Sequence, residues 1–290
     1  MNSRLYNSWN VNVHENLIII GEYGDQGMAQ KVWKSEDYGQ TFIEIFDISN
    51  YASIPTNAHI HGVLYDKYWN RIWLTHGDGV LEVDDNIGAY YSDDLGATWT
   101  KIPIGNQLLN MFAFDDSVIF FTDSAPNGVY RYKRTKKPEL PKLELVYRTD
   151  QEDISITWLC TSLFRKDESE PLIMGFKSTA GGTLPPFALA TYNGVDYFEL
   201  WRDNIAQSSS TDVSFLQADN RLFGNTTGDT RYTYGTKITG VIKKKLHTIA
   251  STVQVPENNP IIDIRDVGVV GNGVDETRKM ISAFRYAAKV

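Results

Sequence analysis

Cysteine is nearly absent from this chain of 290 residues, since Cys160 is the only one. A lone cysteine cannot build an internal disulfide framework, and this one lies in an apolar run, so we expect a core thiol. The sequence also lacks a hydrophobic run of membrane-spanning length, and its polar N-terminus has no apolar signal-peptide centre. We therefore expect synthesis in a cytoplasm without a signal peptide, and no membrane partner.

An excess of positive charge is missing as well. The chain has 28 Lys and Arg against 36 Asp and Glu, a net charge of −8, which argues against binding to nucleic acid or an anionic membrane. We expect the short basic runs at residues 131–137 and 243–245 to lie at solvated strand edges; contact with an anionic polymer or a partner subunit is the alternative. Motifs for nucleotides, flavins or structural zinc are absent too.

A repeated strand pattern is what the sequence does contain. A strand, a polar turn and a short apolar strand recur five times, and the apolar strands begin near residues 17, 71, 118, 172 and 221. This spacing is the period of a four-stranded propeller blade. We predict an all-β, five-bladed β-propeller over residues 1–245, with a strand near Leu5 completing the fifth blade. A two-sheet sandwich is the alternative.

Two octapeptides share a turn pattern: residues 35–42, SEDYGQTF, and residues 92–99, SDDLGATW. Their Ser and Asp side chains are expected to bind their own backbone, Gly to supply a positive φ, and the aromatic residue to pack beneath the turn. The residues with these structural roles are Ser35, Asp37, Gly39, Phe42, Ser92, Asp94, Gly96 and Trp99. The second octapeptide matches the Asp-box pattern S-x-D-x-G-x-T-W in full, so the chain resembles Asp-box (BNR-repeat) propellers of the sialidase type.

The C-terminal part has a different pattern. Residues 261–277 resemble the opening of pectate-lyase-like right-handed β-helix domains, in which an entry strand leads to a glycine- and aspartate-rich stretch and a capping helix. The matching residues are Asp266, Gly268, Gly271, Gly273, Asp275 and Thr277. We therefore expect residues 246–258 to be a linker and residues 259–290 to be the N-terminal cap of a β-helix domain whose remainder is absent.

A propeller followed by such a cap resembles the tailspike and receptor-binding proteins of bacteriophages. The resemblance implies a location in the virion, within the phage tail, and a homotrimeric full-length protein. It also implies other tail proteins as partners, and recognition of a bacterial cell-surface glycan or teichoic acid.

Histidines point to a candidate site. His59 and His61 are two residues apart on one predicted strand, so both side chains leave the same face. The end of the neighbouring strand brings His76 and Asp78 to the same mouth of the channel. The group is interpreted as a metal site of these four residues, as a polar pocket for a sugar, or as hydrogen-bonded lining of a wet channel. Glu22 and Asp123 occupy equivalent rim positions on other blades and join the predicted ligand-binding residues.

Catalysis has weaker support. Sialidases clamp a carboxylate with three arginines, and the first of them lies in an R-I-P motif. Here Arg4 is followed by Leu-Tyr and Arg71 falls inside a strand, with no arginine between them. We therefore assign no catalytic residue and expect a non-catalytic recognition module. A glycoside hydrolase using Glu22, Asp78 and Asp123 is one alternative, and a structural platform of a trimeric tail protein is the other.

Overall fold

The chain divides into two compact units, Met1–Val253 and Gln254–Val290. The computed structural model describes residues 10–23, 30–50, 58–78, 87–104, 106–124, 126–135, 142–149, 158–165, 167–178, 187–202, 213–218, 221–226 and 232–237. The predicted linker and β-helix cap lie outside the described residues, as does the expected strand near Leu5.

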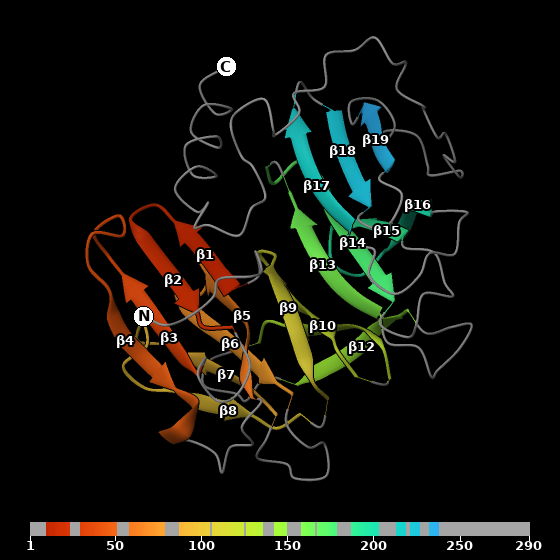
Figure 1. Cartoon of the computed structure of the whole chain (residues 1–290). Coiled ribbons are helices and arrows are strands. Elements are labelled where there is room, and N and C mark those ends of the chain that lie inside the picture. The colour runs from red at the N-terminus through yellow and green to blue at the C-terminus, as the bar shows by residue number, and fades with distance from the viewer. Residues whose placement is uncertain are drawn as a thin grey trace. The chain divides into compact units, whose positions relative to one another are not determined.

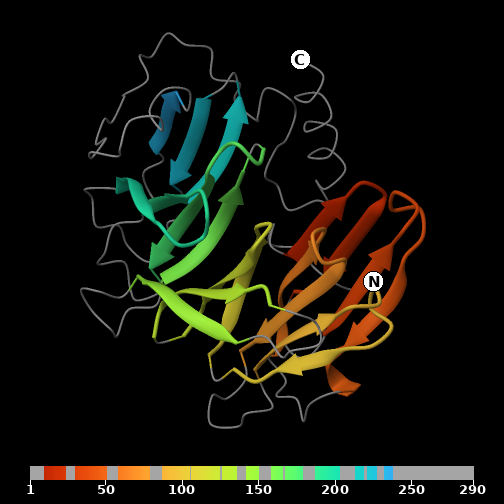
Figure 2. The same ribbon diagram turned by 180° about the vertical axis from the view of Figure 1, so that it is seen from behind.

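The described residues form five antiparallel sheets, shown in Figure 1 and from behind in Figure 2. The first contains β1 (Val11–His14), β2 (Leu17–Gly21), β3 (Lys31–Ser35) and β4 (Ile43–Asp47), followed by the short 3-10 turn η2 (Ile48–Asn50). The second contains β5 (His59–Asp66), β6 (Arg71–Gly77), β7 (Gly88–Ser92) and β8 (Thr100–Ile102). The third contains β9 (Leu108–Ala113), β10 (Ser117–Thr122), β11 (Gly128–Lys133) and β12 (Leu143–Arg148). The fourth contains β13 (Trp158–Phe164), β14 (Leu172–Ser178), β15 (Phe187–Thr191) and β16 (Phe198–Arg202), and the fifth contains β17 (Val213–Ala218), β18 (Arg221–Thr226) and β19 (Tyr232–Lys237).

Each sheet is a meander whose strands pair in sequence order. The first two strands of each sheet contact the first strand of the next: β1 and β2 meet β5, β5 and β6 meet β9, β9 and β10 meet β13, and β13 and β14 meet β17. This is a propeller-like all-β arrangement, and it differs from a sandwich, which has two facing sheets. The five apolar strands expected from the repeat are confirmed as β2, β6, β10, β14 and β18.

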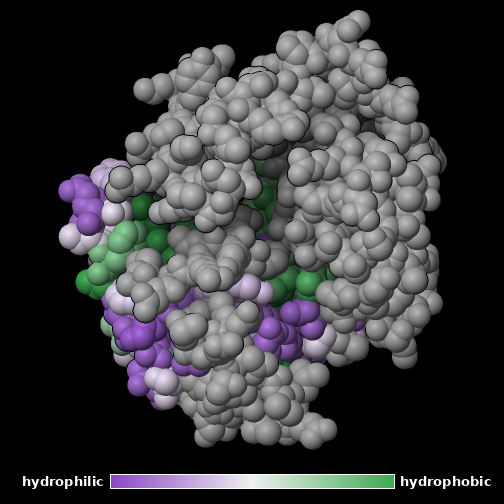
Figure 3. All heavy atoms as spheres, viewed as in Figure 1, coloured by the Kyte–Doolittle hydropathy of each residue, from purple (hydrophilic) through white to green (hydrophobic). Residues whose placement is uncertain are grey.

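Where side-chain burial is defined, which leaves out the fifth sheet, few large hydrophobic side chains are exposed, and these are spread over the first, third and fourth sheets. They are Val13, Tyr38, Ile43, Leu145, Tyr192 and Val195. On the face drawn in Figure 3, hydrophobic residues lie in separate places among hydrophilic ones. Scattered exposure of this kind is normal for a protein surface. Within the described residues, no helix combines the length and apolar character needed to cross a membrane.

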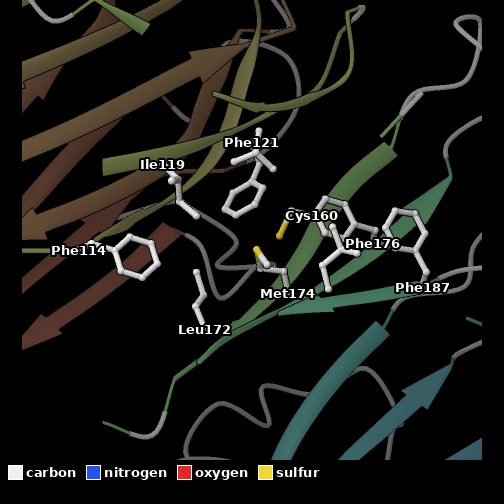
Figure 4. Close-up of a cluster of buried hydrophobic side chains, with 10 residues drawn as sticks. Phe114, Ile119, Phe121, Cys160, Leu172, Met174, Phe176 and Phe187 are labelled. Atoms are coloured by element: carbon white, nitrogen blue, oxygen red, sulfur yellow. The ribbon is translucent and has the colours of Figure 1, made fainter. Parts of the chain in front are cut away.

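The core lies between adjacent sheets because side chains alternate along each strand. On β6, Ile72 and Leu74 pack with the first sheet, whereas Trp73 packs with the third. Between the third and fourth sheets, Phe121 points toward Cys160 (Figure 4). Cys160 is fully buried there, which confirms the expected core thiol.

The octapeptide turn after β7 has the local contacts expected from its sequence. Ser92 Oγ accepts a hydrogen bond from the Gly96 amide at 2.7 Å. Asp94 accepts one from the Thr98 amide at 2.8 Å and another from the Thr98 hydroxyl at 2.6 Å. Gly96 has a φ of 96°, which glycine adopts without a steric penalty. The Trp99 indole donates to the Ile45 carbonyl at 2.8 Å, so this turn also binds the second sheet to the first.

The turn after β3 repeats this geometry. Ser35 Oγ accepts from the Gly39 amide at 2.8 Å, and Asp37 accepts from the Thr41 amide at 2.9 Å and its hydroxyl at 2.6 Å. Gly39 has a φ of 82°. The same contacts in both turns show that they follow from the shared sequence pattern.

Replacing Asp94 by asparagine should weaken the second turn. The hydrogen bonds that Asp94 accepts, chiefly those from Thr98, hold its pKa at about 2, below its ordinary 3.8. Since the folded-state pKa is the lower one, the stabilisation is complete above pH 4 and is lost as pH falls through 2. We expect Asp94→Asn to lower the free energy of unfolding by about 1 kcal/mol at pH 7, the usual size for a hydrogen bond. Urea unfolding from pH 7 to pH 2 should show the difference from wild type shrinking below pH 4, and a pH-independent difference would contradict this account.

A buried ion pair joins the second and third sheets. Asp66 and Arg134 have side chains that are 0% and 5% exposed, and both carboxylate oxygens accept hydrogen bonds from the guanidinium. Asp66 also accepts from the Trp73 indole at 3.2 Å, and Arg134 donates to the Phe114 carbonyl at 2.7 Å. The expectation that residues 131–137 form a solvated edge is therefore wrong for Arg134, because its ion-pair partner belongs to another sheet.

Candidate functional site

Strand pairing brings two histidines and an aspartate together at one end of the second sheet. His59 opens β5 and lies opposite Gly77, the last residue of β6, and Asp78 follows directly. The register shifts between Ile60 and Gly62, so His61 lies at an irregularity of the strand. The antiparallel ladder thus places the start of one strand beside the end of the next.

The three side chains form a compact group. His59 Nε2 lies 3.5 Å from Asp78 Oδ2, and His61 Nε2 lies 3.5 Å from Asp78 Oδ1. One nitrogen or oxygen of each residue lies within 4.8 Å of those of the other two. The imidazoles are 2% and 1% exposed and the Asp78 side chain is 40% exposed, so the group reaches solvent at Asp78.

The third sheet holds this group in place. His61 Nδ1 lies 2.8 Å from the Leu108 carbonyl, a contact that requires the proton on Nδ1. The Gln107 side-chain amide donates to Asp78 Oδ1 at 2.9 Å and to Asp123 Oδ2 at 3.1 Å. Gln107 therefore connects Asp123 to the group, a contact that the sequence did not predict. The position of Gln107 just before β9, the first strand of the next sheet, could have indicated that its side chain lies near the site.

Charge in this group is set by burial and by the carboxylates. Burial lowers the pKa of His61, but the Asp78 and Asp123 carboxylates and the Leu108 carbonyl outweigh it, so the pKa lies above its ordinary value. The polar contact with His61 is the largest influence on Asp78, whose pKa falls to about 2 although burial opposes the change. Asp78 is thus ionised at neutral pH. Its φ of 65° is left-handed, a conformation that aspartate adopts more readily than most residues with a side chain.

His76 lies outside the group, which corrects the expectation of three converging imidazoles. It pairs with Ile60 and stacks on Tyr90, with 5.7 Å between the ring centroids. Its ring is fully buried, and burial lowers its pKa to about 3, with further contributions from nearby cationic groups. His76 was expected at the same mouth because it lies near the end of the neighbouring strand, but it is paired with Ile60 rather than with His59 and so leaves the other face of the sheet.

Glu22 is also held elsewhere. Its Oε1 accepts from the Trp33 indole at 2.9 Å and its Oε2 from the Lys31 amide at 3.3 Å, both within the first sheet. Its backbone carbonyl accepts from the Ile60 amide at 3.1 Å. Glu22 therefore supports the contact between the first two sheets. The neighbouring Tyr23 ring lies against His59, with 4.1 Å between centroids.

No protein-family model matches the chain, and no curated protein sequence is detectably similar to it. Among solved structures it is similar to YCF48 from Cyanidioschyzon merolae, at 13% identity and a TM-score of 0.44, over 86% of this chain and 67% of that one. It is also similar to a GH43_12 retrieved from capybara gut metagenome, at 11% identity and a TM-score of 0.47, over 80% and 51%. A third structure, Bacteroides ovatus Xyloglucan PUL GH43B, gives 9% identity and a TM-score of 0.44, over 78% and 51%.

The chain spans about half to two thirds of the length of these solved structures. At such identities and TM-scores, the similarities assign it neither a substrate nor a reaction.

Proposed function

We propose that this chain is a non-catalytic recognition module of a bacteriophage tail protein and binds a bacterial cell-surface polysaccharide or teichoic acid. The observation that carries the proposal is the preformed group of His59, His61 and Asp78, extended by Gln107 and Asp123. The Asp-box pattern of the two octapeptide turns and the β-helix-like C-terminal segment support the phage assignment. The proposal includes five propeller blades, a homotrimeric full-length protein, other tail proteins as partners, and a location in the virion.

The chemistry of the group suits a hydroxyl-rich ligand. Imidazoles, carboxylates and an amide offer donors and acceptors side by side, and sugar hydroxyls need both. The Tyr23 ring beside His59 adds an aromatic face of the kind that packs against the C–H groups of a sugar. Two carboxylates would repel the phosphates of teichoic acid, so the neutral polysaccharide is the better fit. Because the side chains are already held in place, binding loses little conformational freedom.

The same contacts favour binding over hydrolysis. A glycosidase needs two carboxyl groups beside the scissile bond, and one of them must be able to give up a proton to the leaving oxygen. Both oxygens of Glu22 are already bonded within the first sheet. The carboxylate oxygens of Asp78 face the two imidazoles and the Gln107 amide. Asp123 accepts a hydrogen bond from the same amide. Each candidate acid would first have to leave its partners.

A purely structural platform has less support from the described surface. If these sheets themselves formed the obligate interface of a trimer, they should expose an extended apolar area. Among the described residues whose side-chain burial is defined, which leave out the fifth sheet, the exposed hydrophobic side chains are instead spread over three sheets. This distribution favours a module whose function lies in its polar site.

Retention of the purified chain on bacterial cell walls, with and without teichoic acid, tests the proposal. His61→Asn keeps a donor for the Leu108 carbonyl but removes Nε2, and Asp78→Asn keeps the shape of the side chain but removes its charge. We expect each to weaken retention at least tenfold, on the order expected for losing a charged hydrogen-bond partner. His14→Asn, the same substitution on β1, should bind like wild type.

Two other outcomes would replace the proposal. Sugar released into the supernatant by wild type, and lost in Asp78→Asn, would show a hydrolase. Wild type that stays unbound on every wall tested would leave the structural platform.

A further inference from the structure

We propose that His59, His61 and Asp78 bind a divalent transition-metal ion of the Zn²⁺ type, with coordination positions left open toward solvent. This site uses the same three side chains as the proposed carbohydrate recognition, but its test needs no sugar. Among the described residues, these three are the one group of His, Cys, Asp and Glu side chains whose ligand atoms come together.

Two distances in the group are close to those between ligands of one ion, and the three ligand atoms, which lie within 4.8 Å of one another, have to draw closer around it. Both nitrogen–oxygen contacts to Asp78 measure 3.5 Å, which is longer than the roughly 2.7–3.2 Å of a good N–H···O hydrogen bond. Ligands bound about 2.0–2.1 Å from a tetrahedral Zn²⁺ lie about 3.3 Å from one another. Each Asp78 oxygen therefore stands at nearly the right distance from its imidazole to share an ion with it.

The donor set selects the class of metal. Two imidazole nitrogens and one carboxylate suit Zn²⁺ and its neighbours in the transition series, whereas Ca²⁺ and Mg²⁺ prefer oxygen ligands throughout. Three protein ligands also leave at least one position for water or another oxygen donor, as in catalytic and exchangeable sites. The 40% exposure of the Asp78 side chain provides the open side.

The surroundings aim the ligands at one point. The Leu108 carbonyl lies 2.8 Å from His61 Nδ1, which leaves Nε2 to face the group, and Gln107 holds Asp78 Oδ1 at 2.9 Å. Partners of this kind, beyond the ligands themselves, are typical of protein metal sites. A Cβ at Gly77 would lie 2.3 Å from His61 Cε1, so the glycine makes room for the ring. The site is thus built by packing as well as by its ligands.

Calorimetric titration of the EDTA-treated chain, prepared without a histidine tag, with ZnCl₂ tests the proposal. We expect one ion per chain, and a tenfold or greater loss of affinity in each of His59→Asn, His61→Asn and Asp78→Asn. His14→Asn should bind Zn²⁺ like wild type. Co²⁺ in place of Zn²⁺ should give the visible absorption of a nitrogen- and oxygen-ligated ion, and this band should be absent from Asp78→Asn.

Asp78→Asn is the decisive variant because asparagine tolerates the left-handed backbone and the side chain is half-exposed, so the variant should fold. Circular dichroism checks the folding of all variants. Wild type that takes up no stoichiometric Zn²⁺ would overturn the proposal. So would binding that survives in all three ligand variants, because the ion would then lie elsewhere in the chain.

Discussion

Replacing Asp66 by asparagine is expected to lower the free energy of unfolding by about 3–5 kcal/mol. The change leaves the Arg134 guanidinium in place but removes the charge that balances it. Both side chains are almost completely buried, so water cannot take over the role of the carboxylate. Asp66 also accepts the Trp73 indole hydrogen bond, and Trp73 lies in the core between the second and third sheets. The cost therefore falls on the contact between two sheets.

Urea unfolding followed by tryptophan fluorescence measures this effect. Lys67→Ala is the matched control, because Lys67 and Glu168 form an ion pair with side chains that are 46% and 65% exposed. Water screens such an exposed pair, so its loss should change the free energy of unfolding little. Adding Arg134→Met to Asp66→Asn should recover part of the loss, since the unpaired charge is then gone. If Asp66→Asn costs no more than Lys67→Ala, the buried pair does not hold the sheets together.

Local patterns in the sequence predicted the parts of this fold that local contacts determine. The Ser92 hydroxyl accepts a hydrogen bond from the Gly96 amide, only four residues ahead, so contacts within one octapeptide determine the turn geometry. The strand positions likewise follow from the short apolar runs and polar turns that recur along the chain. His59 and His61 were expected together because side chains two apart share a face, and both do reach Asp78, although β5 is irregular at His61.

Long-range packing determined what the sequence analysis missed. Gln107 precedes the next sheet and is 29 residues from Asp78 in the sequence, so no local pattern predicts their hydrogen bond. Arg134 finds its carboxylate 68 positions away. His76 was misplaced because it is paired with Ile60 and shares its face, where it stacks on Tyr90. The site thus depends on how the third sheet meets the second.

A substitution at Gly62 tests whether the site depends on the contact between the second and third sheets. A Cβ on Gly62 would lie 2.6 Å from the Leu109 carbonyl oxygen of β9 and 3.2 Å from Thr75 Oγ1. Thr75 Oγ1 already donates to that carbonyl at 2.6 Å. Because the obstacle is backbone, no side-chain rotation can relieve the clash, and Gly62→Ala must move β5 and β9 apart. We expect a loss of about 1–3 kcal/mol in the free energy of unfolding, the usual cost of overpacking.

The same shift should reach the site. His61 follows β5 while the Leu108 carbonyl follows β9, so their 2.8 Å contact lengthens when the strands separate. Gly62→Ala should therefore weaken both cell-wall retention and Zn²⁺ binding, measured under conditions where circular dichroism shows the variant folded. His14→Asn again serves as the control, since it leaves both strands untouched. A variant that loses stability but keeps wild-type Zn²⁺ affinity would show that the Leu108 carbonyl does not orient His61, because the two strands moved and the site did not.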